Sequence, residues 1–236
     1  ENLAVSTIYG GYTGYKVGMF VNNNSTNNPS RTTIQNDGTI RFNGYSSIGM
    51  YTSAGNGLSD IQMLNNGTID INTGNYTGYS NFGMKLDGTV TNDATKKIIL
   101  NNSTISISNG AGIAVTGSTG EGFVENSSAG KITVASGTGV YLAPTSTRVE
   151  DAVNNGTITV TNGAVMYAVG GRDEITRVIN NGTISVTTGM GMAATGKNSE
   201  AVNNSKDFII GASTGGFYAA NGGKVINTAN LSVNSS

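Results

Sequence analysis

The densest group of charged side chains lies between positions 148 and 177, and it is the first place to look for catalytic chemistry. The group consists of Arg148, Glu150, Asp151, Arg172, Asp173, Glu174 and Arg177. Clustered carboxylates with nearby Arg or Lys, or with calcium, are what polysaccharide-cleaving sites need. The chain has no histidine and no cysteine, which removes the usual general base, the Ser-His and Cys-His pairs and the common zinc sites. A carboxylate-based, polysaccharide-cleaving enzyme is therefore the catalytic hypothesis.

The signs of the charges in and around this group alternate from one sequence repeat to the next. One column contains Asp151, Arg177, Glu200 and Lys224, and a second contains Arg148, Glu174 and Lys197. In parallel coils stacked about 4.8 Å apart, each charge would lie beside its opposite. We interpret the columns as ion pairs that hold the register of the coils, each contributing about 0–1 kcal/mol. On this interpretation the chain is not an enzyme and has no catalytic, cofactor-binding or metal-binding residue.

The tyrosines are the second group of residues that could carry a function. Seven of the ten precede residue 80. Five of them share one place in the repeat, between a first and a second predicted strand: Tyr12, Tyr15, Tyr45, Tyr76 and Tyr79. A tyrosine offers a flat face and a hydroxyl, which suit sugar rings and protein hot spots. We consider this corner a candidate ligand-binding site; the alternative is that the rings pack on one another and roof the corner without a ligand.

The elements that position these side chains come from a repeated motif, Asn-Asn-Gly-Thr-Ile. Copies and variants of it occupy positions 36–42, 65–71, 101–107, 154–160, 180–186 and 227–233. Asn and Gly accept positive φ at low cost and suit a turn. The following Thr-Ile-x-Val is β-branched with apolar residues two apart, which predicts a strand with one buried face.

The first apolar residue of each Thr-Ile-type strand marks the period of the repeat. The markers are Ile40, Ile69, Ile105, Ile132, Ile158, Ile184, Phe208 and Leu231. They are 29, 36, 27, 26, 26, 24 and 23 residues apart, a period that suits one coil of a β-solenoid. Each period holds two further apolar patches, one typified by Gly-apolar and one by Val-Asn, so each coil is expected to contain three short strands.

The fold expected from this pattern is all-β: a right-handed parallel β-helix of about eight coils. Residues 1–236 form a single β-helix, of which 1–33 are a less regular N-terminal coil and loop, and residues 72–81 are an insertion. The predicted core consists of Ile69, Ile71, Ile105, Ile107, Ile113, Val115, Ile132, Val134, Val140, Leu142, Ile158, Val160, Ile184 and Val186. An asparagine follows each third strand, and stacked amides of this kind hydrogen-bond along the axis. This asparagine column is Asn65, Asn101, Asn126, Asn154, Asn180, Asn203 and Asn227.

The composition excludes several partners. The net charge is −1 and only 11% of residues are charged, which gives no electrostatic case for nucleic acid or a membrane surface. No window of about 18 apolar residues exists, so this segment is not inserted in a membrane. No cofactor is predicted.

The Asn-Asn-Gly-Thr-Ile repeat, with Gly-apolar and Val-Asn strands between copies, resembles the passenger domains of bacterial type V autotransporters. The large fusobacterial outer-membrane adhesins are the most similar type, and the resemblance covers residues 34–236. It implies a right-handed parallel β-helix displayed at the surface or outer membrane of a Gram-negative bacterium, or secreted. The membrane-inserted part is then expected elsewhere in the full-length protein. The lack of cysteine fits export through an oxidising periplasm.

Three functions follow from these observations. The first is adhesion to host cells or other bacteria, with a surface protein or glycan as partner, through the exposed surface and loops; the resemblance connects such a segment with virulence. The second is a passive stalk or spacer in a giant autotransporter. The third, which the alternating charges disfavour, is the polysaccharide-cleaving enzyme. Because nothing near Leu231 resembles a cap, we expect the native chain to continue beyond Ser236.

Overall fold

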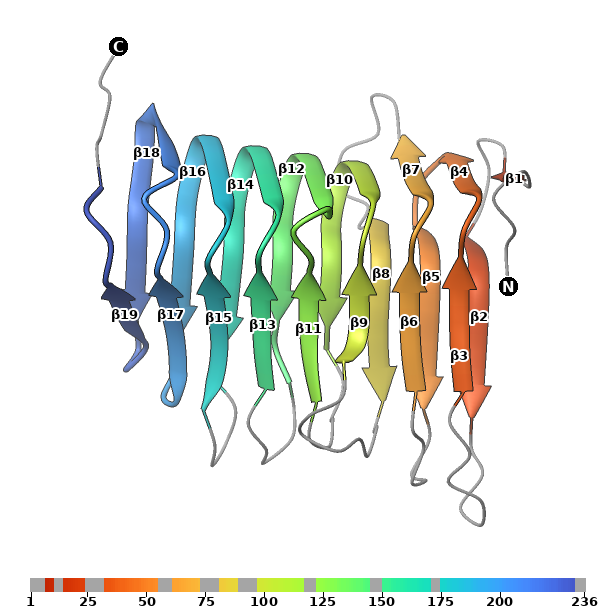
Figure 1. Ribbon diagram of the computed structural model, residues 1–236, viewed down its shortest axis with the longest axis horizontal. Helices are drawn as coiled ribbons and strands as arrows, with labels where there is room; N and C mark the ends of the chain where they lie inside the picture. Colours follow the sequence, from red (N-terminus) through yellow and green to blue (C-terminus); the bar gives the residue numbers. More distant parts are fainter. Residues whose placement is uncertain are drawn as a thin grey trace.

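The computed structural model shows an all-β molecule built from two stacks of parallel strands (Figure 1). The structure describes residues 7–10, 15–23, 32–54, 61–72, 81–88, 97–116, 122–144, 150–170 and 175–231. Within these residues every element is a strand, and each strand pair with a defined register is parallel. The expected all-β, parallel fold is therefore confirmed.

The first sheet contains the predicted third strand of each coil. It is formed by β3 (Thr32–Asn36), β6 (Ile61–Asn65), β9 (Lys97–Asn101), β11 (Gly122–Asn126), β13 (Glu150–Asn154), β15 (Thr176–Asn180), β17 (Ser199–Asn203) and β19 (Lys224–Asn227). Each strand is four or five residues long. In β6, β15 and β17 buried and partly exposed residues alternate, and each of these strands ends on a buried asparagine. This period of two is what the Val-Asn patches predict.

The second sheet contains the predicted first and second strands. Near the N-terminus these are separate: β1 (Thr7–Gly10), β4 (Thr39–Asn43) and β7 (Thr68–Asn72) stack as first strands, and β2 (Lys16–Asn23), β5 (Ser47–Ala54) and β8 (Asn81–Gly88) stack as second strands. Further along, the two are joined into the long strands β10 (Thr104–Val115), β12 (Lys131–Leu142), β14 (Thr157–Val169), β16 (Thr183–Thr195) and β18 (Phe208–Ala220). Three strands per coil thus become two in these later coils.

A glycine at the bend of each long strand explains why pairing continues without a break. Gly110, Gly137, Gly163 and Gly189 have φ values of 133°, 130°, 136° and 124°, a region that other residues rarely adopt. They are stacked in register. A Cβ atom on Gly163 would overlap the carbonyl oxygen of Gly137. Only glycine permits both the conformation and the close approach of adjacent coils at this corner.

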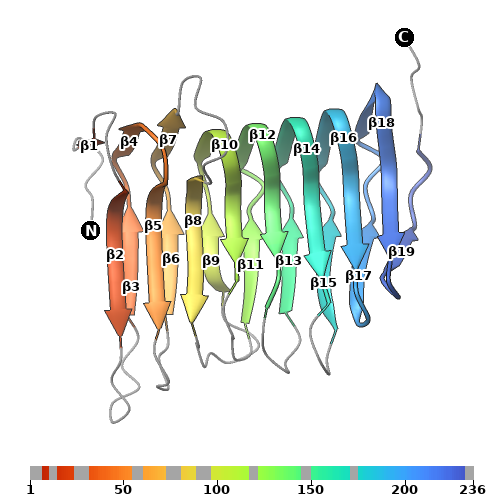
Figure 2. The ribbon, with the colours of Figure 1, turned by 180° about the vertical axis from the view of Figure 1, so that it is seen from behind.

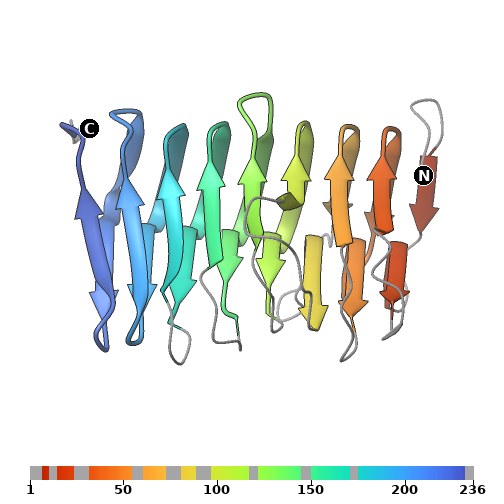
Figure 3. The ribbon, with the colours of Figure 1, turned by 60° about the horizontal axis from the view of Figure 1, so that its bottom comes forward.

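The path of the chain gives a right-handed solenoid, as Figure 1 shows. Strands of the first sheet run upward at the front, the chain passes over the top, the second sheet runs downward behind, and each coil lies to the left of the one before. Figure 3 shows the same coils side by side along the long axis. The described residues complete about six turns, slightly fewer than the eight predicted. The last repeat marker, Leu231, lies outside any strand, so counting markers overestimates the turns.

The core lies between the two sheets and consists of stacked aliphatic side chains. Every residue of the predicted core is buried, with at most 3% of its surface exposed. The register places like on like: Ile105 pairs with Ile132, which pairs with Ile158, which pairs with Ile184. Identical residues in identical surroundings explain the near-identical repeats. The solenoid therefore fixes which residues point outward, where any binding must occur.

Candidate functional site

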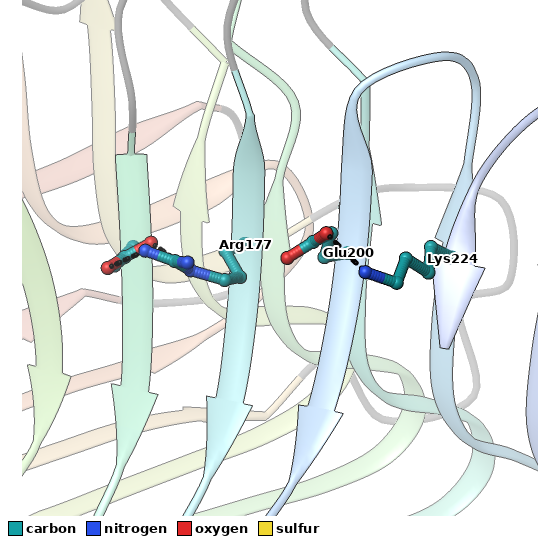
Figure 4. A network of polar contacts seen from close by, with 4 residues as sticks. Arg177, Glu200 and Lys224 are labelled. Carbon is teal, nitrogen blue, oxygen red and sulfur yellow. Dashed lines mark hydrogen bonds and ion pairs between the residues drawn. The ribbon is translucent and has the colours of Figure 1, made fainter. Parts of the chain in front are cut away.

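The charged column beginning at Asp151 forms ion pairs between coils. Arg177 binds Asp151 through two hydrogen bonds, Nε to Oδ1 and Nη2 to Oδ2, both 2.9 Å long. Lys224 Nζ lies 3.3 Å from Glu200 Oε1. Figure 4 shows Arg177, Glu200 and Lys224 in a row across adjacent coils. The hydrogen bonds to Asp151 raise the pKa of Arg177 above its usual value, so the guanidinium is held in its charged form.

This column therefore joins adjacent coils through ion pairs, as predicted, and the carboxylates of Asp151 and Glu200 are engaged in them. Arg148, Arg172, Asp173 and Glu174 lie outside the described residues, and only the backbone of Glu150 is described. Of the second column, only Lys197 is described. Among the described side chains, no group of three or more His, Cys, Asp or Glu residues could hold a metal ion.

The asparagine column is a continuous buried ladder of side-chain amides. Each Nδ2 donates to the Oδ1 of the next coil, from Asn36 through to Asn227, over 2.7 to 2.8 Å. Asn36 extends the predicted column by one coil, and its members from Asn36 to Asn203 are at most 1% exposed. The ladder satisfies polar groups that would otherwise be buried without partners, which is a structural role.

A second, exposed amide ladder was not predicted from the sequence. Asn102 donates to Asn66, Asn181 to Asn155 and Asn204 to Asn181, over 2.9 to 3.0 Å. These are the second asparagines of the Asn-Asn-Gly and Asn-Asn-Ser turns. The repeat of this asparagine was the feature of the sequence from which the ladder could have been predicted. Asn66 also donates to Asp37, and this bond together with one from Gln35 lowers the pKa of Asp37.

The tyrosine corner is described in part. Lys16 pairs with Ser47, so Tyr15 and Tyr45 lie just before paired positions, at the same bend of adjacent coils. Tyr15 is 63% exposed and Tyr45 is half-buried. The pKa of Tyr15 is raised, chiefly by its partial burial and to a smaller extent by electrostatic repulsion from Tyr51 and Asp87. Tyr12, Tyr76 and Tyr79 lie outside the described residues, so the predicted cluster of five stays a prediction.

A different row of aromatic side chains lies on the outer face of the second sheet, which faces the viewer in Figure 2. We call it the aromatic strip. It occupies one outward position of successive strands, in the order Phe20, Tyr51, Lys85, Ala114, Tyr141, Tyr167, Ala193 and Tyr218. The flanking residues on each strand point inward: Val140 and Leu142, for example, are 3% and 1% exposed.

The N-terminal half of the strip combines rings with charge. Phe20 stacks on Tyr51 with ring centroids 5.3 Å apart and an interplanar angle of 25°. Lys85 Nζ lies 5.7 Å from the Tyr51 ring and 5.0 Å from the Phe82 ring, within reach of cation–π attraction. The same ammonium lies 3.1 Å from Asp87 Oδ2. Phe20 remains 53% exposed, so this half presents an aromatic surface beside a lysine that is ion-paired with Asp87.

The C-terminal half of the strip is fixed by side-chain contacts between coils. The rings of Tyr141 and Tyr167 meet edge to face, with centroids 5.7 Å apart and an interplanar angle of 65°. The Tyr167 hydroxyl is hydrogen-bonded to the Thr195 hydroxyl of the next coil over 2.9 Å. Ala193 is completely buried although it occupies an outward position between Tyr167 and Tyr218. The Tyr167 side chain, whose hydroxyl is bonded to Thr195 on the same strand, extends over this strand.

Sequence reasoning missed the strip because its tyrosines were grouped with the apolar residues of the second strand. The available signal was the period of two: each of Tyr141 and Tyr167 lies between two buried residues and so points outward. A shallow groove of about 210 Å³ on the first-strand part of the same sheet was also not predicted. It is lined by Asp70, Ile71, Asn72, Ser106, Ile107, Ser108, Thr133 and Ala135.

Searches against protein family models, curated protein sequences and solved structures found no match. Among the described residues no helix is long and apolar enough to cross a membrane. The candidate site is therefore defined by its geometry alone, and the aromatic strip is an outward row that includes the exposed side chains of Phe20 and Tyr218.

Proposed function

We propose that this chain is an adhesive segment of a cell-surface β-helix of the autotransporter passenger type. It attaches to host cells or to other bacteria through its outer face. The observation that carries the proposal is the aromatic strip, in which Tyr218 is 46% and Phe20 53% exposed. Large exposed aromatic side chains are enriched where proteins bind partners, and here they share one face.

The remaining outward columns support this division of roles. The charges at Asp151 and Arg177 pair with one another, and the exposed amides bond along the axis. Both columns are occupied in joining coils. The strip is different because Phe20 and Tyr218 remain about half exposed, and a parallel solenoid holds equivalent outward positions in a straight row at intervals of about 4.8 Å.

The test is binding of the labelled chain to epithelial cells and to bacterial cells. The first variant replaces Phe20, Tyr51, Tyr167 and Tyr218 by Ala, and the matched control replaces the exposed Ile209, on the same sheet outside the strip, by Ala. We expect the first variant to lose most cell binding and the control to retain it, with both keeping the β-sheet circular dichroism spectrum. Equal adhesion of the strip variant and the parent would exclude the strip.

A variant with Tyr12, Tyr45, Tyr76 and Tyr79 replaced by Ala tests the tyrosine corner in the same assay. If this variant loses adhesion while the strip variant keeps it, the corner is the binding site.

The second candidate function is a passive spacer, and the two amide ladders favour it. The buried ladder links every coil from Asn36 to Asn227, which suits a rod that must keep its length under load. A spacer has no ligand, so the parent chain would bind neither cell type in the assay above.

A further inference from the structure

The C-terminal half of the aromatic strip has the properties of a surface built to stack against a sugar. We call the side chains of Tyr141, Tyr167 and Tyr218, with Thr195, the tyrosine platform. Tyr167 is held in place at both ends, by the edge of Tyr141 at a centroid distance of 5.7 Å and by the Thr195 hydroxyl at 2.9 Å. A ring that is already immobilised loses little conformational entropy on binding.

The shape of the platform follows from the alanine in its middle. Ala193 lies between Tyr167 and Tyr218 in the register and has no exposed surface. The Tyr167 hydroxyl is bonded to Thr195 on the same strand as Ala193, so the Tyr167 side chain extends over that strand. The platform therefore follows the outer face of the sheet from one coil to the next. From Tyr141 to Tyr218 it spans three strand spacings, roughly 14 Å along the axis.

The charge around the platform restricts the ligand class. The outward positions two residues after Tyr141, Tyr167, Ala193 and Tyr218 are Ala143, Val169, Thr195 and Ala220. Neither this second row nor the platform row carries a charge. A nucleic-acid strand also stacks on aromatic rings, but its phosphates need several lysines or arginines. Among the described residues that directly follow these strands, Lys197 is the one basic residue. Protein hot spots favour well-packed pockets, whereas the platform follows the outer face of a sheet. An uncharged ring with an apolar face and polar edges matches the platform best.

We propose that the tyrosine platform binds an uncharged, linear oligosaccharide that lies along the solenoid axis. The apolar face of a hexose stacks on Tyr167 and Tyr218, and its hydroxyls bond the tyrosine and threonine hydroxyls at the platform edge. The inference rests on the proposed adhesive function in that it names the ligand class of the same strip. It assigns the neutral sugar to the C-terminal half, away from the lysine at position 85.

The experiment measures binding of the 236-residue chain to immobilised linear hexasaccharides. The neutral probes are hexamers of glucose, galactose, mannose and N-acetylglucosamine, and the charged probe is a heparin hexasaccharide. We expect at least one neutral hexamer to bind and the heparin probe not to bind. We expect Tyr167→Ala and Tyr218→Ala each to weaken that binding by about tenfold, since each removes one stacking face.

Three further variants separate stacking from folding. Tyr167→Phe keeps the ring but loses the bond to Thr195, so we expect a smaller loss than for Tyr167→Ala. Thr195→Val releases the same hydroxyl from the other side and should give a similar, smaller loss. Ile209 is an exposed apolar residue of β18 that lies outside the platform, so Ile209→Ala should leave sugar binding unchanged.

The outcomes distinguish this inference from the adhesive function. If no neutral hexamer binds, or if binding is the same in the Tyr167→Ala and Tyr218→Ala variants, the platform is not a sugar site. If the chain nevertheless adheres to cells through the strip, the adhesive function stands and its partner is not a neutral linear hexose chain of this kind. If a neutral hexamer binds at the platform but cells do not bind, the inference holds and the adhesive function is wrong.

Discussion

The residue with the strictest requirements in this molecule is the buried asparagine. Each amide of the inner ladder accepts a bond from one coil and donates a bond to the next. Most Nδ2 groups lie near a main-chain carbonyl as well, as Asn101 does at 2.9 Å from the Ser103 oxygen. A carboxylate has no donor, and an aliphatic side chain has neither group. Asparagine is therefore needed in every coil, because one change removes partners in two neighbours.

Replacing Asn154 by Ala should be strongly destabilising. It removes one acceptor of the Asn126 amide, which keeps its bond to the Gly130 oxygen, and it removes the donor to the buried Asn180 oxygen. A buried polar group left without its partner costs about 1–3 kcal/mol. Denaturant unfolding measures the loss. The matched control is Asn155→Ala, whose exposed amide bonds to Glu125 over 2.9 Å; it should cost less than about 1 kcal/mol. Equal losses for the two variants would refute the assignment of the inner ladder as the stabilising one.

Tyr141 should make the stability depend on pH in the alkaline range. Burial, and then Tyr167, raises the pKa of this phenol above its ordinary value of 10.0. The unfolded chain therefore loses its proton first, so the stabilisation is complete below about pH 10 and disappears as the pH rises through the folded-state pKa. Tyr141→Phe removes the phenol. As the pH rises above about 10, the free energy of unfolding of this variant should therefore decrease less than that of the parent protein. Identical pH profiles for parent and variant would contradict this origin.

The sequence predicts these residues to different extents. The asparagine and charge columns were predictable because a repeat of fixed length places like residues in register, and register alone decides which side chains meet. The outward direction of Tyr141 and Tyr167 was predictable from the period of two. Their edge-to-face contact was not, because it depends on ring orientations that a pattern of spacings does not contain.

At the scale of the elements, the bend of the second sheet decides how the coils close. The apolar patches of the sequence predicted the first and second strands of each coil as separate short strands. In β10 to β16 the bend glycines stack on one another, and each long strand keeps pairing through the corner. Separate strands remain at β4 and β5, where the bend includes Gly44 and Ser46, the latter with φ of 54°.

Replacing Gly163 by Ala should therefore destabilise the solenoid. The backbone conformation alone costs about 1–3 kcal/mol for a residue other than glycine, and the new methyl group would overlap the carbonyl of Gly137. Thermal and denaturant unfolding both measure the effect. Gly215→Ala is the control, because a Cβ there meets no atom nearer than 3.9 Å. If both substitutions were equally tolerated, the bend would not depend on glycine.

At the scale of the whole molecule, each coil contacts mainly the coils before and after it. The sheets follow coil order without exception in their main paths, so stability is close to a sum of coil and interface contributions. The central coils bury their inner residues completely, as Val160 and Met166 show with no exposed surface. In the last coil, the inner Phe217 of β18 and Val225 of β19 are only partly buried.

Hydrogen exchange should therefore reveal a gradient along the solenoid axis. In the 236-residue chain we expect the amides of β12 and β14 to exchange most slowly and those of β19 to exchange fastest, because an outer coil opens without disturbing the rest. Ile158→Ala, a fully buried change in β14, should cost about 2–5 kcal/mol and lower the protection of β12, β14 and β16 more than that of β4 and β7. The control, Thr159→Ala, points outward from the same strand and should leave the gradient unchanged. Uniform exchange across all strands, lowered equally everywhere by Ile158→Ala, would show instead that the coils unfold as one cooperative unit.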